Sequence, residues 1–327
     1  MSTEKISVKG LWEVLKNTFS GFSNDKVTKL SASLAYYTVF SMGPLLVVLI
    51  SLCGFFFKRD AVEGKVYAVL RDFVGNDTAI QLQEIIKNAS VSSKGTIAAT
   101  IGVIVLLIGA TTVFGEIQDS INMIWGLKPK PKRGWILMLQ NRFLSFSVII
   151  SLGFLLLVSL AISGIIESIS TRLQAYFPNV TVVVFYIINL LLTMGISMLI
   201  FAVIFKVLPD ARIRWKDVIV GAIITAALFI IGKFCISIYI SKAQVGSTYG
   251  AAGSLVVLLV WIYYSSIILY MGAEFTKAYA VKYGAAIHPN AYAVTTKQIE
   301  VEMGKQTIQQ KENNNPVSPD NNNTKQP

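Results

Sequence analysis

The chain has 327 residues, of which 54% are hydrophobic and only 14% are charged, and its formal net charge is +11. Because a soluble domain carries about a quarter charged residues, this composition excludes a soluble protein and places much of the surface in lipid. Membrane topology then explains the excess of Lys and Arg better than nucleic-acid binding does. One histidine, His288, and two isolated cysteines, Cys53 and Cys235, build neither a zinc site nor a disulfide framework, so we expect no metal and no cofactor.

Residues 1–29 form a cytoplasmic N-terminal segment with an amphipathic pattern. Its apolar residues recur at helical spacing, at Leu11, Val14, Leu15, Phe19 and Phe22. The pattern predicts a helix in the membrane interface, with Trp12 near the lipid headgroups. The alternative is that the same face packs against the rest of the protein.

Six apolar stretches are long enough to cross roughly 30 Å of hydrocarbon, which takes about 20 residues in a helix. They occupy residues 30–57, 94–116, 142–167, 180–205, 218–239 and 254–273. Lipid offers no hydrogen-bond partners to peptide groups, so each stretch should be helical. The predicted fold class is an all-α membrane protein with a domain of six transmembrane helices over residues 30–284.

The connection between the first two stretches, residues 58–94, also has helical spacing. A stripe from Val62 to Val74 precedes a Gly75–Asp77 break, and Thr78 with Gln81 resembles a capping box for a second helix. We expect an extracytoplasmic amphipathic helical hairpin that covers a vestibule or rests on lipid.

The distribution of Lys and Arg predicts the orientation. Positive charge gathers in residues 1–32, 128–142 and 206–216, whereas the two short loops on the opposite side each carry one basic residue. The positive-inside rule therefore puts both termini in the cytoplasm, and the first apolar run is too long for a cleaved signal peptide. Residues 285–327 are polar and rich in Asn, which predicts a disordered cytoplasmic tail.

Several local strings together resemble one known family. They are Ala35–Pro44, Phe114–Gly126, Asn141–Arg142, Phe205–Asp210, Arg214–Trp215, Gly232–Lys233, Tyr249–Ser254 and Gly272–Glu274. Over residues 10–285 the chain resembles the YihY/BrkB family of bacterial inner-membrane proteins. The resemblance implies a six-helix plasma-membrane protein of unsettled biochemical role, for which ribonuclease BN, virulence and transport labels have been used.

The ribonuclease label is not supported by the residues. RNA hydrolysis needs a metal cage of His and carboxylates, or a paired general acid and base. With one histidine and no such set, we expect no catalytic residues, no enzyme activity and no nucleic-acid partner. The basic run Lys128–Arg133 is better explained by topology and by contact with anionic lipid headgroups.

Lys233 is the charge that lies inside a predicted span. A charge at mid-membrane costs roughly 2.5–3.5 kcal/mol on insertion scales, so it either extends to the headgroups or faces a polar path. Glu167, at the outer end of the third span, is the acid at matching depth. A Lys233–Glu167 pair is therefore our hypothesis for an intramembrane site.

Helix-breaking residues mark two further candidate positions. Pro44 removes a hydrogen bond in the first span, which predicts a kink that serves packing or a gating hinge. Gly250 and Gly253 lie in a glycine-rich entrance to the last span, which suits either close helix packing or a broken turn that binds a ligand.

Charged residues of mixed sign lie at the cytoplasmic ends of the spans. They are Glu116, Asp119, Arg142, Lys206, Asp210 and Glu274. We expect a salt-bridge belt that locks the bundle, with an inner gate as the functional alternative.

The favoured function is that of a transporter, channel or lipid-handling protein of the bacterial inner membrane, because an intramembrane charge and broken helices are costly without a path to serve. The alternative is a noncatalytic membrane scaffold whose tail and basic loop recruit partners. Anionic headgroups at the cytoplasmic face are the expected partners, and homo-oligomerisation stays open.

Overall fold

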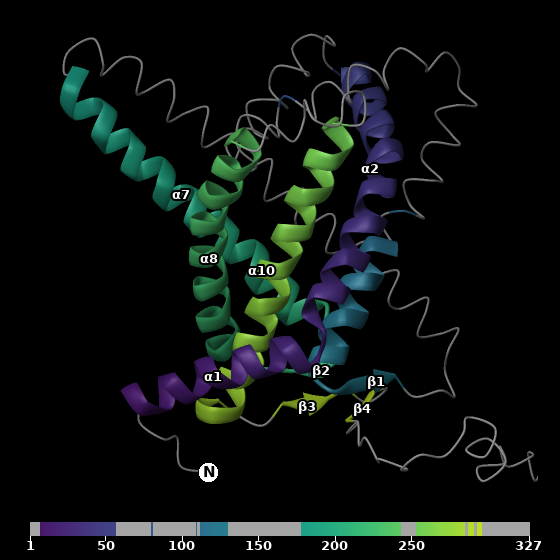
Figure 1. The fold of residues 1–327 in the computed structure, drawn as a ribbon, viewed down its shortest axis with the longest axis vertical. Helices are drawn as coiled ribbons and strands as arrows, with labels where there is room; N and C mark the ends of the chain where they lie inside the picture. Colours follow the sequence, from purple (N-terminus) through teal and green to yellow (C-terminus); the bar gives the residue numbers. More distant parts are fainter. Residues whose placement is uncertain are drawn as a thin grey trace, which may run out of the picture. The chain divides into compact units, whose positions relative to one another are not determined.

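The computed structural model describes residues 7–56, 80, 109, 112–129, 178–242, 253–284, 287–290 and 293–295. All of them belong to one unit, Met1–Thr295. Its long helices are α1 (Val8–Asn24), α2 (Val27–Phe56), α7 (Pro178–Val207), α8 (Trp215–Lys242) and α10 (Gly253–Tyr283) (Figure 1). Residues 112–124 form a further helical segment, called here the 112–124 helix.

Four of the predicted spans correspond to described helices. The stretches 30–57, 180–205, 218–239 and 254–273 fall in α2, α7, α8 and α10. In the described part of the chain, Val183–Val207, Trp215–Ile240 and Leu255–Tyr283 are long and apolar enough to cross a membrane. The predicted hairpin at 58–94 and spans at 94–116 and 142–167 lie outside the described residues, apart from positions 80, 109 and 112–116.

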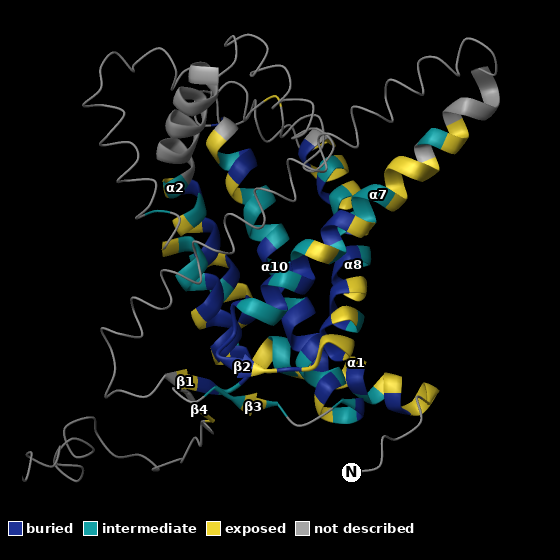
Figure 2. Ribbon diagram, turned by 180° about the vertical axis from the view of Figure 1, so that it is seen from behind, coloured by how far each residue is buried: buried dark blue, intermediate teal, exposed yellow. Residues whose placement is uncertain are grey.

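Large apolar side chains on α7 and α8 remain exposed in the isolated chain. On α7 they include Val183, Ile187 and Leu191, and on α8 they include Ile231 and Phe234 (Figure 2). A helix that is hydrophobic around its whole circumference is typical of a membrane span, and so much contiguous apolar surface would not be tolerated in water. Lipid contact explains this surface, as expected for a membrane protein.

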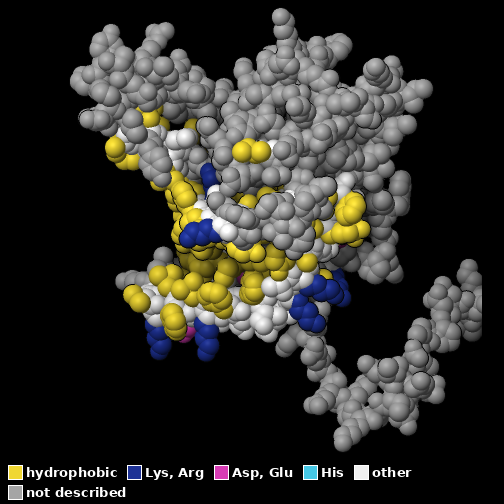
Figure 3. Space-filling view, turned by 45° about the horizontal axis from the view of Figure 1, so that its top comes forward, with side chains coloured by type: hydrophobic (Ala, Val, Ile, Leu, Met, Phe, Trp, Pro, Cys, Tyr) yellow, Lys and Arg dark blue, Asp and Glu magenta, His cyan; other side chains and the backbone are white. Residues whose placement is uncertain are grey.

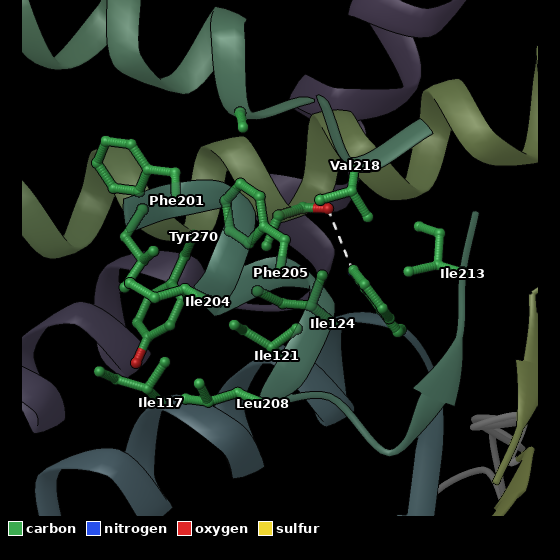
Figure 4. Packing of buried hydrophobic residues seen from close by; sticks show 14 of the residues in the cluster. Ile117, Ile121, Ile124, Phe201, Ile204, Phe205, Leu208, Ile213, Val218 and Tyr270 are labelled. Atoms are coloured by element: carbon green, nitrogen blue, oxygen red, sulfur yellow. Dashed lines mark hydrogen bonds between the residues drawn. The ribbon is translucent and has the colours of Figure 1, made fainter. Parts of the chain in front are cut away.

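The buried core lies where α10 packs against α2 and α8, and where α8 packs against α7. Its side chains come from several elements and include Val27, Ile121, Ile124, Phe205, Val218 and Tyr270 (Figure 4). Trp125 joins the 112–124 helix to α10, because its Nε1 donates to the Ala273 carbonyl over 3.2 Å. This core fixes the end of the helices on which the charged residues lie.

α8 and α10 cross through two glycine–threonine contacts. A Cβ atom at Gly221 would lie 2.9 Å from the Cβ of Thr276, and a Cβ atom at Gly272 would lie 2.9 Å from the Cβ of Thr225. Neither position could carry a side chain without a shift of the facing helix. The sequence prediction placed close glycine packing at the entrance to α10, where Gly253 is buried, but it missed these two contacts.

α1 presents three faces to three surroundings. Val14 is buried against Phe275 and Tyr283 of α10. A second face, formed by Leu11, Trp12, Leu15 and Phe19, is exposed, and the third carries the exposed Lys9, Lys16 and Ser20. Figure 3 shows hydrophobic side chains gathered on one side of α1 and basic ones on the other. One face of α1 packs on α10, as the alternative predicted, whereas the position of α1 in the membrane interface stays a prediction.

Two short antiparallel ladders tie distant loops to the segment after α10. β1 (Leu127–Pro129) pairs with β4 (Ala293–Thr295), and β2 (Ala211–Arg212) pairs with β3 (His288–Pro289). The predicted all-α class misses these ladders, whose strands of two or three residues are too short to show a periodic pattern. β3 and β4 lie at the start of the predicted tail, residues 285–327.

Candidate functional site

Buried charged residues gather where α1, the 112–124 helix and α10 meet. Glu274 is 1% exposed and Asp210 is 2% exposed. Carboxylates are almost never buried to this extent unless they are paired, so each of these groups requires an account of its partners.

Glu274 lies on α10 against the backbone of α1. A Cβ atom at Gly21 would lie 2.8 Å from the carboxylate carbon of Glu274, so a side chain there would displace this carboxylate. Glu274 Oε2 is 3.7 Å from the Nζ of Lys277, one turn further along α10. Glu274 Oε1 is buried and has no hydrogen-bond partner among the described residues. The carboxylate is therefore only half satisfied.

Lys277 connects all three elements at this point. Its ammonium lies 3.3 Å from Asp25 Oδ2 at the end of α1, and it donates to the backbone carbonyl of Ile124. The same ammonium therefore serves both Asp25 and Glu274. We call Asp25, Glu274 and Lys277 the acid–lysine cluster.

Asp210 is held by amide groups of the 112–124 helix. Its Oδ1 accepts from Gln118 Nε2, and its Oδ2 accepts from Asn122 Nδ2, both over 2.9 Å. Asn122 Oδ1 in turn accepts from the Asp210 backbone N–H over 2.9 Å, and the Asp210 carbonyl accepts from the Asn290 N–H. This network locks the loop between α7 and α8 to the 112–124 helix and to the end of β3.

Asp119 lies on the 112–124 helix with part of its side chain open to solvent. The surrounding protein desolvates its carboxylate and raises its pKa, and the negative charges of Glu116 and Asp210 raise it further. Glu116 lies on the same helix, and Asp210 lies on the loop between α7 and α8. Desolvation first, and repulsion by these two acids second, make Asp119 a group that readily accepts a proton.

Two further contacts hold α1 on α10, and a cap completes the start of α1. Lys282 Nζ lies 2.6 Å from Glu13 Oε2, and this hydrogen bond and charge lower the pKa of Glu13. The Tyr283 hydroxyl donates to the Ser7 carbonyl over 3.3 Å, in the hollow beside Gly10. Ser7 caps the helix by accepting from the Gly10 N–H over 3.1 Å.

The comparison with protein families decides what kind of membrane protein this is. The family described as "Virulence factor BrkB" matches residues 18–294, which is most of the chain. The chain belongs to the BrkB family. The matched region includes the acid–lysine cluster, the β2–β3 ladder and all of the β1–β4 ladder except Thr295.

Relatives of this BrkB-family protein are similar over most of their length. A UPF0761 membrane protein of Aeromonas salmonicida (strain A449) is 28% identical over 265 residues, which cover 79% of this chain and 86% of the relative. Another, from Alteromonas mediterranea, is 27% identical and covers 77% of this chain and 82% of the relative. A third, from Pseudoalteromonas translucida, is 28% identical, with 77% and 81% covered. No solved structure gives a significant match. The predicted family resemblance is confirmed.

The residues of the predicted belt have mixed partners. Glu274 pairs with Lys277, whereas Gln118 and Asn122 bind the Asp210 carboxylate. Lys206 donates to the Ile213 carbonyl and lies over the Trp215 ring, 5.5 Å from its centroid. Arg142 lies outside the described residues.

The structure describes only some of the candidate residues in the predicted spans. Lys233 is half-buried on α8, but Glu167 lies outside the described residues, so their pairing stays a prediction. Gly250 also lies outside them. α2 continues as a helix through Pro44, whose side-chain contacts are outside the described part.

The sequence analysis did not identify the residues of α1 that lie next to Glu274. Asp25 and Gly21 are more than 240 residues away from Glu274 in the sequence. The spacing of Glu274 and Lys277 was a usable signal, because residues three apart face each other on a helix. Gln118 and Asn122 belong to the string that carried the family resemblance, yet their amides were not connected to Asp210.

Proposed function

We propose that this protein is a membrane transporter, with lipid transport included, and that its cytoplasmic gate is the junction of α1, the 112–124 helix and α10. The observation that carries the proposal is the buried, half-satisfied Glu274. A carboxylate placed this way costs free energy that a noncatalytic scaffold has no reason to retain. Ionisable groups in such positions are typical of transport pathways and of elements that move.

The contacts of α1 suit a gate that opens. α1 is attached to α10 by polar contacts at Tyr283, Lys282 and Glu274, beside the apolar contact of Val14 with Phe275. It joins α2 through Lys26, whose φ of 52° is a left-handed conformation that L-residues rarely adopt. Such a position costs of order 1–3 kcal/mol and marks a hinge between the two helices.

The proposed topology has six transmembrane helices, an outer helical hairpin and both termini in the cytoplasm of a bacterium, with the protein in the inner membrane. The basic residues Lys9, Lys16, Lys277 and Lys282 support this orientation, since they lie at the α1 end of the helices. The proposed function involves no enzymatic step and no nucleic acid.

We further propose that α1 lies in the cytoplasmic leaflet and contacts anionic headgroups. Its exposed Trp12, Leu15 and Phe19 face would reach the acyl boundary, while Lys9 and Lys16 would meet the headgroup charge. Quenching of Trp12 fluorescence by brominated lipids tests this placement. A Trp12 signal that is insensitive to brominated lipid would contradict it.

Reconstitution tests the transport proposal. Purified protein in liposomes should carry out ion flux or movement of fluorescent phospholipid between leaflets, and Glu274→Leu should reduce the rate. Asn17→Ala is the control, because it changes an exposed side chain of α1 outside the contacts with α10 described above and should retain the rate. Wild-type protein that is folded but supports neither activity would favour the scaffold alternative.

A further inference from the structure

We propose that the acid–lysine cluster is a proton-binding site, and that the bound proton holds α1 on α10. This inference goes beyond the transport proposal, because it concerns the attachment of α1 and needs no transported substrate. It rests on the charge count of the cluster, the burial of Glu274 and the way α1 covers it.

The cluster has one positive charge for two negative ones. Asp25 lies 3.3 Å from Lys277 Nζ, and Glu274 lies 3.7 Å from it. With both acids ionised, the cluster carries a net charge of −1. A proton on one carboxyl would make it neutral, and burial favours neutral groups strongly.

The position of Glu274 identifies the carboxyl that takes the proton. It is 1% exposed, whereas the side chain of Asp25 is 27% exposed and reaches solvent. In the described part of the chain, the buried Glu274 Oε1 has no hydrogen-bond partner. The buried acid therefore pays the larger desolvation cost when it is ionised, and it gains most from protonation.

No other charge is available to neutralise the cluster in the part of the chain that the structure describes. From α1 the group that acts on Glu274 is Asp25, and from α10 it is Lys277. The 112–124 helix contributes the Ile124 carbonyl, which already accepts from Lys277. The described residues also hold no set of three metal-ligating side chains, which favours a proton over a metal ion.

The proton should strengthen the attachment of α1. When α1 lies on α10, Gly21 covers Glu274 and Asp25 approaches Lys277. When α1 leaves, Glu274 meets water and Asp25 moves away, so ionisation is no longer penalised. The attached state therefore holds more protons than the detached state, and attachment weakens as pH rises.

Pulsed electron paramagnetic resonance in nanodiscs measures the attachment directly. Spin labels replace the exposed Asn17 on α1 and Val281 on α10, in a Cys53→Ala and Cys235→Ala background. At about pH 5 we expect one short distance between the labels, and at about pH 9 a second population at a longer distance. These two pH values are chosen so that the buried carboxyl is protonated at the lower one and ionised at the higher one. Glu274→Gln should keep the short distance at both pH values.

Two variants separate the proton site from its surroundings. Asp25→Asn removes the excess negative charge and should also abolish the pH dependence, which provides a second test if Glu274→Gln fails to fold. Glu13→Gln, which breaks the exposed pair with Lys282, should keep the wild-type response between about pH 7 and pH 9.

Infrared difference spectroscopy provides an independent readout of the proton. Wild-type protein should show a carboxylic-acid C=O band that disappears on raising the pH and is missing in Glu274→Gln. A wild-type distance distribution that does not change with pH, or an unchanged pH response in Glu274→Gln, would overturn the inference. So would the absence of the carboxylic-acid band. None of these results depends on flux, so they stand apart from the liposome experiment.

Discussion

Thr225 of α8 occupies the space that Gly272 of α10 leaves open, and Gly221 of α8 accommodates Thr276 of α10 in the same way. Each threonine hydroxyl donates over 2.7 Å to a carbonyl of its own helix, from Thr225 to Gly221 and from Thr276 to Gly272. The hydroxyls of both threonines are thus satisfied within their own helices. The two glycines let the backbones of α8 and α10 approach each other closely. In lipid, such close approach is a main source of helix association.

Gly272→Ala should destabilise the α8–α10 pair. Its new Cβ would lie 2.9 Å from Thr225 Cβ, and overpacking of this kind typically costs about 1–3 kcal/mol. Thermal unfolding in detergent should show a lower midpoint. Adding Thr225→Gly should recover part of the loss, because it removes the opposing atoms.

The control for this change is Gly195→Ala on α7. A Cβ atom there meets nothing within 4 Å, so the variant should be as stable as wild type or slightly more stable. Equal losses in Gly272→Ala and Gly195→Ala would show that the glycine–threonine contact is not the cause.

Asn122→Ala should destabilise the loop between α7 and α8. It removes the partner of Asp210 Oδ2 and of the Asp210 backbone N–H, and unsatisfied buried groups cost about 1–3 kcal/mol each. A thermal midpoint in detergent measures the loss. The neighbouring Met123 is exposed, so Met123→Ala should be close to neutral, and a comparable drop there would argue against the network.

The Glu13–Lys282 pair should lose its contribution in acid. Lys282 lowers the pKa of Glu13 below its ordinary value of 4.5, so the pair stabilises α1 above that pH and is lost as pH falls through the lowered pKa. Hydrogen exchange of α1 amides should accelerate in that acidic range. In Glu13→Gln this acidic acceleration should be absent, and its persistence would assign the effect to another group.

Asp119→Asn should stabilise the protein at neutral and alkaline pH. Because its pKa is raised in the folded state, wild-type Asp119 favours folding when protonated, and that contribution is lost as pH rises through the raised pKa. The thermal midpoint of the variant should exceed that of wild type above this pKa and approach it in acid. A midpoint difference that is constant with pH would contradict the prediction.

The extent of the spans could be predicted from the sequence because apolar content is local information. Their ends were predicted less well for a physical reason. The predicted span ends at Ala273 because Glu274, Lys277 and Lys282 interrupt the apolar pattern. α10 itself continues ten residues further, to Tyr283. These residues remain helical because α1 supplies their partners, and a partner more than 240 residues away leaves no trace in a local window.

The candidate site was predicted in part. Glu274, Glu116 and Asp119 were identified by charge and depth, and the structure places them at the α1 end of the helices. The chemistry of Glu274 depends on Gly21 and Asp25, which carry no distinctive local signal. A glycine opposite a carboxylate becomes informative only when the two helices are placed together.

The ladders also impose an order on biosynthesis. β3 and β4 are translated after α10 and after the segments with which they pair. The segments Leu127–Pro129 and Ala211–Arg212 therefore have no strand partner until then. A chain halted before His288 would insert its helices yet leave the Asp210 carbonyl without the Asn290 amide. Both ladders therefore close only in a chain that has been translated as far as Thr295.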